Sequence, residues 1–195
     1  MNGFTQPAGA TPLDPDTLAG LIPDIATQGE LNEFEENNIL EAHRWVARAR
    51  GTDRDILLDT SLRKLHAKMF DRTWSWAGKY RLKETNIGID WIEIPVAIVN
   101  LCLNTRAQIE AEAYDPIELA ARFHHALVSI HPFPNGNGRH ARFATDLLCR
   151  RQKWFRPTWG SVSLTADGAS RREYIAALRD ADGYDFSRLV RFIAS

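Results

Sequence analysis

The stretch from His131 to Arg142, HPFPNGNGRHAR, gathers the residues of this chain whose types and spacing could do chemistry together. A histidine can accept a proton near neutral pH, because its ordinary pKa is about 6.5. Two glycines two positions apart permit positive φ and leave backbone amides open. Two arginines three positions apart share one face of a helical turn, where paired guanidinium groups suit a polyphosphate. The combination indicates a general base beside an anion site.

Backbone preferences predict how this stretch is held. A helix is expected over 116–130, because Asp115 offers an N-cap and a proline follows it in the first turn. Pro132 disfavours the α conformation for the residue before it, so His131 is expected to be extended. Arg139 begins the next helix, and a glycine-rich turn that leads into a helix N-terminus is a ready anion site.

The rest of the pattern predicts an all-α single domain with one β-hairpin. Apolar side chains recur at helical spacing in three further segments, 31–46, 57–70 and 96–112. Residues 80–95 instead alternate with a period near two, which predicts a hairpin that Pro95 closes. Proline and glycine in residues 1–18 predict a flexible N-terminal arm, which leaves residues 19–195 as the domain.

Composition and charge exclude several classes of protein. The 195 residues, 44% hydrophobic and 25% charged, are typical of one globular domain. A formal net charge of -1 gives no global field for nucleic acid or an anionic membrane, and no apolar run is long enough to span a bilayer. Cys102 and Cys149 lie in apolar contexts and are expected to be reduced and buried. With no signal peptide pattern, a cytoplasmic protein is expected.

The same stretch closely resembles the signature of the Fic (Fic/Doc) family, which has His, Pro, Phe, an acidic residue, Gly-Asn-Gly and two arginines at these relative places. The segment WAGKYR, residues 76–81, is similar to the WAG-x-x-R segment before the family's hairpin flap. Its aromatic residues are expected in the core, with Arg81 as a salt-bridge donor. The segments TPLDPDTLAGLIP and GELNEFEENNILEA are similar to a subgroup called mobile mystery protein B. From about Ile22 onward the resemblance implies a Fic-type helical domain with one flap.

The activity that the resemblance implies is that of a protein adenylyltransferase, which moves AMP from ATP to a Ser, Thr or Tyr hydroxyl of a target protein. His131 would be the general base. The implied phosphate-binding residues, acting through backbone amides, the asparagine side chain and two guanidinium groups, are Gly136, Asn137, Gly138, Arg139 and Arg142. The flap would pair with the target by strand addition, with Asn86 and Trp91 as contacts.

One residue departs from the signature. Asn135 stands where the family has the Asp or Glu that binds Mg²⁺, and an amide oxygen brings no charge to a metal. A weak Mg²⁺ site carried mostly by the phosphates is therefore expected. The alternatives are a catalytically weak or inactive binding module of the same fold, or a kinase-type transferase. A metal site built from His124, His125 or His140 is disfavoured, because no HExxH motif or carboxylate at ligand spacing accompanies them.

Inhibition could come from within the chain or from a partner. The sequence from Asn32 to Asn37 is the nearest match to the family's inhibitory S/T-x-x-x-E-G/N motif, with Glu36 in the place of the inhibitory glutamate. Asparagine replaces the Ser or Thr, and a solvated acidic helix face is the alternative interpretation. A separate small antitoxin-like protein is the other candidate inhibitor.

Overall fold

The computed structural model describes residues 13–48, 55–161 and 168–195. The helices of these residues are α1 (Pro15–Leu18), α2 (Gln28–Arg48), α3 (Asp59–Phe70), α4 (Ile94–Glu110), α5 (Pro116–Ile130), α6 (Asn137–Gln152), α7 (Ala169–Asp182) and α8 (Ser187–Ala194). Two 3₁₀ turns, Trp91–Glu93 and Trp159–Ser161, lie among them. Within the same residues, β-pairing is confined to one isolated bridge between Leu21 and Trp74. The all-α prediction is confirmed.

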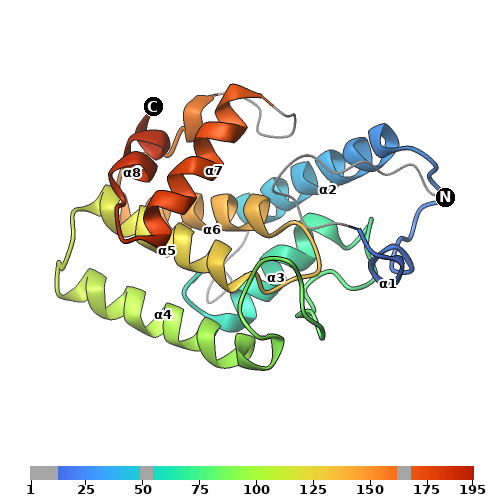
Figure 1. Ribbon diagram of the computed structural model, residues 1–195, viewed down its shortest axis with the longest axis horizontal. Helices are drawn as coiled ribbons and strands as arrows, with labels where there is room; N and C mark the ends of the chain where they lie inside the picture. The colour runs from blue at the N-terminus through green and yellow to red at the C-terminus, as the bar shows by residue number, and fades with distance from the viewer. Residues whose placement is uncertain (1–12, 49–54, 162–167) are drawn as a thin grey trace.

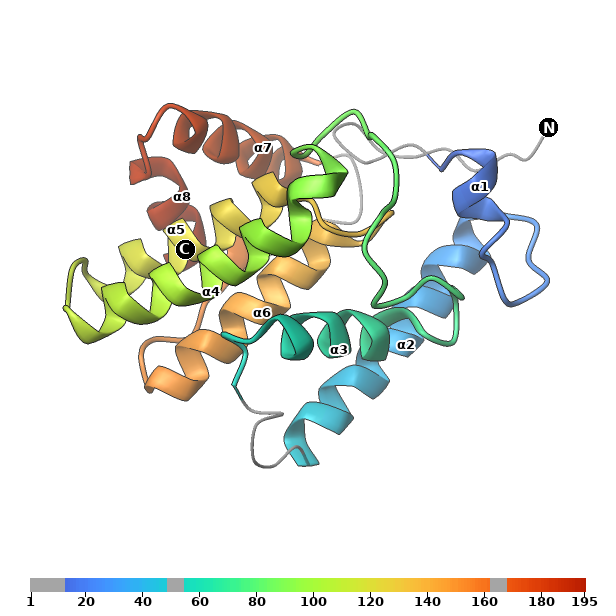
Figure 2. The same cartoon turned by 90° about the horizontal axis from the view of Figure 1, so that it is seen from below.

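Helix α5 lies at the centre of the arrangement (Figures 1 and 2). It packs against α4, α6 and α8, while α2 and α3 pack against each other on the far side of α6. The apolar and small residues of α5 lie on several of its sides instead of in one stripe, as expected for a helix that other helices cover on several sides. Its buried residues are Leu119, Ala120, Ala121, Phe123, His124, Leu127 and Ile130.

Two apolar clusters meet at α5. The larger one fills the space among α2, α3, α4, α5 and α6 and includes Phe123. The smaller one lies among α5, α7 and α8 and includes Ala121 and Tyr174. Because α5 contributes to both clusters, the C-terminal helices are fixed relative to the loop that follows α5.

The predicted helix bounds agree with the structure at α5 and differ by two residues at the start of α3. The prediction of a β-hairpin over 80–95 is wrong, because no strands pair within these residues. Residues 80–90 form a loop, and the 3₁₀ turn over Trp91–Glu93 follows it. The side chain of Asp90 accepts a hydrogen bond from the Ile92 amide at 2.9 Å, which starts that turn in place of a second strand.

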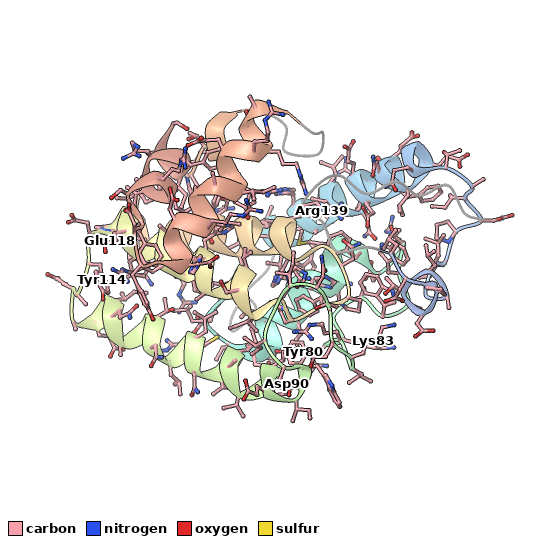
Figure 3. The ribbon with its side chains drawn as sticks, in the orientation of Figure 1. Tyr80, Lys83, Asp90, Tyr114, Glu118 and Arg139 are labelled. Carbon is pink, nitrogen blue, oxygen red and sulfur yellow. The ribbon has the colours of Figure 1, made fainter. Side chains whose placement is uncertain are left out.

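The 80–90 loop is anchored at its start. Tyr80 donates a hydrogen bond to Asp59 at the start of α3. Lys83 forms ion pairs with Asp14 at 3.0 Å and Asp16 at 2.8 Å, which join the loop to α1. Figure 3 shows Tyr80, Lys83 and Asp90 along this loop. These contacts come from segments distant in the sequence, so local alternation of apolar residues did not reveal them.

The end of the predicted flexible arm is helical in the structure. Asp14 caps α1 by accepting a hydrogen bond from the Thr17 amide at 2.8 Å. The Trp76 indole donates to the Thr17 carbonyl at 3.1 Å, so α1 is held against the domain. Residues 1–12 of the arm lie outside the described residues.

Both cysteines are buried and free of disulfide bonds, as the sequence predicted. Burial raises the pKa of each thiol, Cys102 and Cys149, to about 12, which keeps both protonated and unreactive at neutral pH. In the ranges that the structure describes, none of the helices has the length and apolar character needed to cross a membrane.

Candidate active site

His131 ends α5 in a left-handed conformation, with φ 53° and ψ 59°. Its amide donates to the Leu127 carbonyl at 3.4 Å, as the C-terminal residue of an αL cap does. The prediction of an extended backbone here is wrong. A left-handed residue also avoids the right-handed α conformation that Pro132 disfavours, while it satisfies a terminal carbonyl of the helix. The chain therefore turns sharply at the candidate base.

Arg81 fixes the backbone on both sides of His131. Its side-chain Nε donates to the His131 carbonyl at 2.8 Å, and one Nη approaches the Ile130 carbonyl at 3.5 Å. Its backbone amide donates to the Pro132 carbonyl at 2.9 Å. The guanidinium group also donates to the carbonyls of Lys83 and Ile89 in the 80–90 loop. Arg81 was predicted to donate to a salt bridge, but its hydrogen-bond acceptors are carbonyls, which explains why this loop needs no partner strand.

The 80–90 loop lies directly on His131. Gly88 has φ 113°, and a Cβ at this position would lie 2.7 Å from the His131 Cβ and 2.7 Å from an Nη of Arg81. Only glycine allows this approach with that backbone conformation. His131 is consequently 7% exposed. The loop therefore helps to bury His131.

The pKa of His131 is lowered to about 4, chiefly by burial; a hydrogen bond with the Val128 backbone opposes this shift, and the charge of Arg81 adds to it. The imidazole is therefore neutral at pH 7. A neutral imidazole can accept a proton, so the protonation state fits a general base.

Asn137 closes the loop after His131 onto itself. Its side-chain oxygen accepts from the Phe133 amide at 2.9 Å, and its side-chain nitrogen donates to the Phe133 carbonyl at 2.8 Å. The residue is 2% exposed. The sequence predicted that this side chain would contact phosphate, but the structure uses it inside the loop. The group that Asn137 can still offer to a phosphate is its backbone amide.

The N-terminus of α6 supplies open amides. Helix geometry leaves the amides of Asn137, Gly138 and Arg139 without an intrahelical acceptor, and the helix dipole adds partial positive charge there. Gly136 has φ 78°, and a Cβ would lie 2.6 Å from the Phe70 ring. Glycine is thus required for the loop to enter α6 so close to α3. The result is an anion-binding geometry built from backbone.

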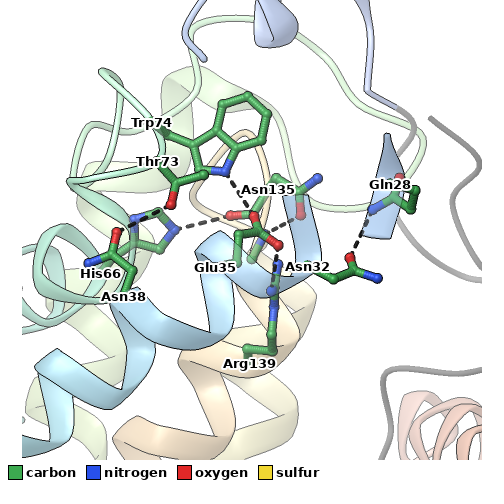
Figure 4. A network of polar contacts seen from close by, with 10 residues as sticks. Gln28, Asn32, Glu35, Asn38, His66, Thr73, Trp74, Asn135 and Arg139 are labelled. Carbon is green, nitrogen blue, oxygen red and sulfur yellow. Dashed lines mark hydrogen bonds and ion pairs between the residues drawn. The ribbon is translucent and has the colours of Figure 1, made fainter. Parts of the chain in front are cut away.

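Arg139 forms an ion pair with Glu35 of α2, with Nη1 2.7 Å from the carboxylate (Figure 4). The other carboxylate oxygen of Glu35 accepts from the Trp74 indole at 2.8 Å. Glu35 is 4% exposed, so this charge is buried with its partners. The Arg139 guanidinium also lies 4.9 Å from the centre of the Phe70 ring. Arg139 is therefore oriented by one acidic and one aromatic neighbour, Glu35 and Phe70.

Arg142 is held from the opposite side by α7. Its guanidinium lies 5.6 Å from the centre of the Tyr174 ring and hydrogen-bonds the Tyr174 hydroxyl. That hydroxyl also lies 2.9 Å from Nε2 of His124 on α5. Burial lowers the pKa of the Arg142 guanidinium, although it stays charged at neutral pH. His124 is thus part of the support for Arg142.

The two arginines share a pocket with Glu36. The pocket has a volume of about 210 Å³ and is lined by Asn32, Glu36, Ile39, Arg139 and Arg142. The structure therefore brings the predicted inhibitory glutamate next to the predicted phosphate-binding arginines. The two predicted flap contacts lie apart from this pocket. Asn86 is exposed in the 80–90 loop, and Trp91 packs, half-buried, against the larger apolar cluster.

Asn135 does not fit a metal held by the protein itself. Its side-chain oxygen is neutral and accepts a hydrogen bond from the Gly136 amide at 2.5 Å. Among the described residues, no group of three or more His, Cys, Asp or Glu side chains could hold a metal ion.

Three residues of this region were missed by the sequence analysis: Glu35, His66 and Tyr174. The helical phase of α2 could have revealed Glu35, because it lies four positions after buried Leu31 and three before buried Asn38. His66 likewise shares its helix face with apolar residues of α3. Tyr174 lies more than thirty residues after the motif, and no local signal connects the two.

The part of the chain that carries this geometry is similar to known proteins. Residues 57–149 match the family model described as the Fic/DOC family. A segment of 82 residues is 39% identical to protein adenylyltransferase fic-1 of Caenorhabditis briggsae, and it covers 42% of this chain and 15% of that protein. The chain thus spans a small part of the length of this curated relative.

Solved structures share the fold. A Fic-1 fragment from C. elegans superimposes with a TM-score of 0.70 at 23% identity, over 91% of this chain and 51% of that one. BepC of Bartonella tribocorum, solved with bound AMPPNP, superimposes with a TM-score of 0.67 at 17% identity, over 87% of each chain. Membership of the mobile mystery protein B subgroup stays a prediction. The region that matches the Fic/DOC family model, residues 57–149, contains His131, the loop after it and both arginines.

Proposed function

We propose that this chain is a protein adenylyltransferase that transfers AMP from ATP to a Ser, Thr or Tyr hydroxyl of a target protein. One observation carries the proposal. The neutral imidazole of His131 and the guanidinium groups of Arg139 and Arg142 lie at opposite ends of one short loop, whose open amides begin α6. The curated relative that bears the name protein adenylyltransferase and the relative solved with AMPPNP support the same activity.

The reaction assigns a separate task to each part of the loop. His131 takes the proton from the target hydroxyl as the oxygen attacks the α-phosphorus of ATP. The bond between the α-phosphorus and the oxygen that bridges to the β-phosphate breaks, and pyrophosphate leaves. The amides of Asn137 and Gly138 bind phosphate oxygens, and the two arginines stabilise the charge that develops on the leaving group.

The 80–90 loop is the proposed entrance for the target. Gly88 contacts His131, so a hydroxyl reaches the imidazole only after this part of the loop moves away. Its backbone could then pair with an extended segment of the target, with exposed Asn86 and half-buried Trp91 beside that segment.

Mg²⁺ would enter with the nucleotide. Because Asn135 offers one neutral oxygen, the ligands of such an ion would be phosphate oxygens and water. The protein's own contribution to charge stabilisation then falls on Arg139 and Arg142. This weak metal contact also supports a second candidate, a Fic-fold binding module with little or no catalysis.

Glu36 is the proposed internal inhibitor. Its position in the pocket that Arg139 and Arg142 also line supports this role, because a carboxylate there repels phosphate and competes for a guanidinium group. The alternative is a separate antitoxin-like protein that supplies an equivalent carboxylate.

A labelled nucleotide tests the proposal. Purified protein is incubated with a cell lysate and ATP labelled on either the α- or the γ-phosphate. Adenylyl transfer labels lysate proteins from α-labelled ATP alone. Label from γ-labelled ATP would instead identify a kinase-type transferase. If neither nucleotide labels any protein, even with Glu36→Gly and Asn135→Asp in the same chain, the binding module is the correct interpretation.

A further inference from the structure

His66 connects three parts of the chain that meet at the anion-binding loop. It lies on α3 and is 0% exposed. One ring nitrogen, Nδ1, lies 3.0 Å from the Gly78 amide nitrogen. The other, Nε2, lies 3.0 Å from the Asn135 carbonyl oxygen, a contact that Figure 4 shows. The imidazole thus spans the distance between the turn that contains Gly78 and the loop that follows His131.

These two partners fix the tautomer of His66. A backbone amide can only donate, so Nδ1 accepts and carries no proton. A carbonyl oxygen can only accept, so Nε2 carries the proton and donates to Asn135. Burial holds the pKa of His66 well below its ordinary value, and the nearby His140 and Arg139 act in the same direction. His66 is therefore a neutral, oriented donor to the loop.

The ring also supports the loop through its face. It stacks on Phe133 with ring centres 3.7 Å apart and an interplanar angle of 21°. Phe133 is the residue whose amide and carbonyl are both bound by Asn137. Asn135 immediately precedes Gly136, where the chain takes its positive φ before α6 begins. Contacts from His66 thus act on two residues of the loop, one on each side of Pro134.

We propose that His66 is a positioning residue for the phosphate-binding amides. By donating to the Asn135 carbonyl, it sets the orientation of the peptide that joins Asn135 to Gly136, and thereby the direction of the amides at the start of α6. The inference rests on the proposed function for its catalytic consequence. The effect on the loop itself can be measured without any nucleotide.

Two substitutions separate the two hydrogen bonds. His66→Gln places an amide group near the position of Nε2, so it retains a donor for the Asn135 carbonyl and loses the acceptor for the Gly78 amide. His66→Asn places its amide group near the position of Nδ1, so it retains the acceptor and loses the donor. Both variants lose the stacking on Phe133. Ile98→Val, a buried change in α4, serves as a control for lowered stability alone.

The first measurement is hydrogen exchange of the Gly136 amide, which donates to the Asn135 side chain, in the free protein. This amide is expected to exchange about tenfold faster in His66→Asn than in His66→Gln, the effect of losing one hydrogen bond of about 1.4 kcal/mol. Ile98→Val is expected to match the wild-type protein. Equal exchange rates in the two His66 variants, or faster exchange in His66→Gln, would overturn the inference.

The second measurement is the dissociation constant for ATP. It is expected to rise about tenfold in His66→Asn and to stay within about twofold of wild type in His66→Gln. A wild-type protein that binds ATP but transfers no AMP would contradict the proposed function. The ATP affinities of the two His66 variants would still test the role of His66. Equal affinity in both variants would show that His66 has a structural role only.

Discussion

Arg139 donates to the buried carboxylate of Glu35 at 2.7 Å, and this ion pair joins α2 to the first turn of α6. The same carboxylate accepts from the Trp74 indole. The pair therefore neutralises one of the two guanidinium groups at the proposed phosphate site. A bound triphosphate must compete with Glu35 for that charge or bind Arg139 with the pair intact.

Replacing Glu35 with glutamine distinguishes these two cases. The Glu35→Gln side chain keeps an acceptor for Trp74 and removes the negative charge. We expect the free energy of unfolding to fall by about 1.5–3 kcal/mol, the usual loss for a hydrogen bond to a charged group. We also expect ATP to bind more tightly, because Arg139 is no longer neutralised. Urea unfolding and calorimetric titration with ATP measure the two effects, and weaker ATP binding would show that Glu35 orients Arg139 instead of competing for it.

Glu36 is expected to inhibit nucleotide binding from the same helix. Removing its charge with Glu36→Gln, or its side chain with Glu36→Gly, should raise AMP transfer about tenfold, since it removes repulsion from the triphosphate. Glu33, the neighbour three positions earlier on the exposed surface of α2, offers a matched control. If Glu33→Gln and Glu36→Gln leave the rate equally unchanged, inhibition within the chain is excluded.

The metal dependence of the reaction should follow the charge at position 135. In Asn135→Asp a carboxylate keeps the acceptor for the Gly136 amide and adds one negative charge near the phosphates. We expect the Mg²⁺ concentration for half-maximal transfer to fall by about tenfold in this variant. Transfer rates over a Mg²⁺ titration test this, and identical curves for Asn135→Asp and wild type would place the ion away from this residue.

Stability should decrease in mild acid because of buried histidines. The pKa of His124 is lowered to about 3, and the pKa values of His131 and His140 to about 4, chiefly by burial. In the unfolded chain each histidine binds a proton below about pH 6.5, whereas the folded protein leaves it neutral down to the lowered pKa. Unfolding therefore takes up protons. The contribution of these neutral histidines to the free energy of unfolding is fully present above pH 6.5 and is lost as the pH falls toward 4.

The slope of this loss is at most about 1.4 kcal/mol per pH unit for each histidine. Urea unfolding at pH 7.5, 6 and 5 measures it. His140→Gln, which keeps a donor for the Leu62 carbonyl, should reduce the slope by one histidine's share. A free energy of unfolding that is constant from pH 7.5 to 5 would contradict the burial of these rings.

Local sequence was sufficient where the structure depends on local contacts. The helix Pro116–Ile130 was predicted with its true bounds, because its proline start and the following Pro132 act on neighbouring residues. The prediction for the 80–90 loop was wrong, because its conformation depends on Arg81 and on ion pairs to α1. The same holds for the conformation of His131, which combines the demands of a helix cap and a proline.

In the candidate site, too, features that depend on local sequence were predicted and features that depend on distant contacts were not. The types and spacing of His131, Arg139 and Arg142 predicted a base beside an anion site, and the structure places all three on one loop and helix start. It could not be predicted that Asn137 would use its side chain within the loop, since its partner Phe133 offers no special sequence signal. The ion pair between Glu35 and Arg139 could not be predicted either, because it depends on the rotation of α2 about its axis.

The central claim is that His131 removes the proton from the target hydroxyl. Transfer of label from α-labelled ATP to lysate proteins tests it most directly, with ATP affinity measured in parallel. His131→Asn is the matched variant beside His131→Ala, because asparagine tolerates the left-handed backbone of this position. We predict that both variants retain ATP binding and lose transfer by about 10²-fold or more. Transfer at the wild-type rate in a folded His131→Asn protein would contradict the account.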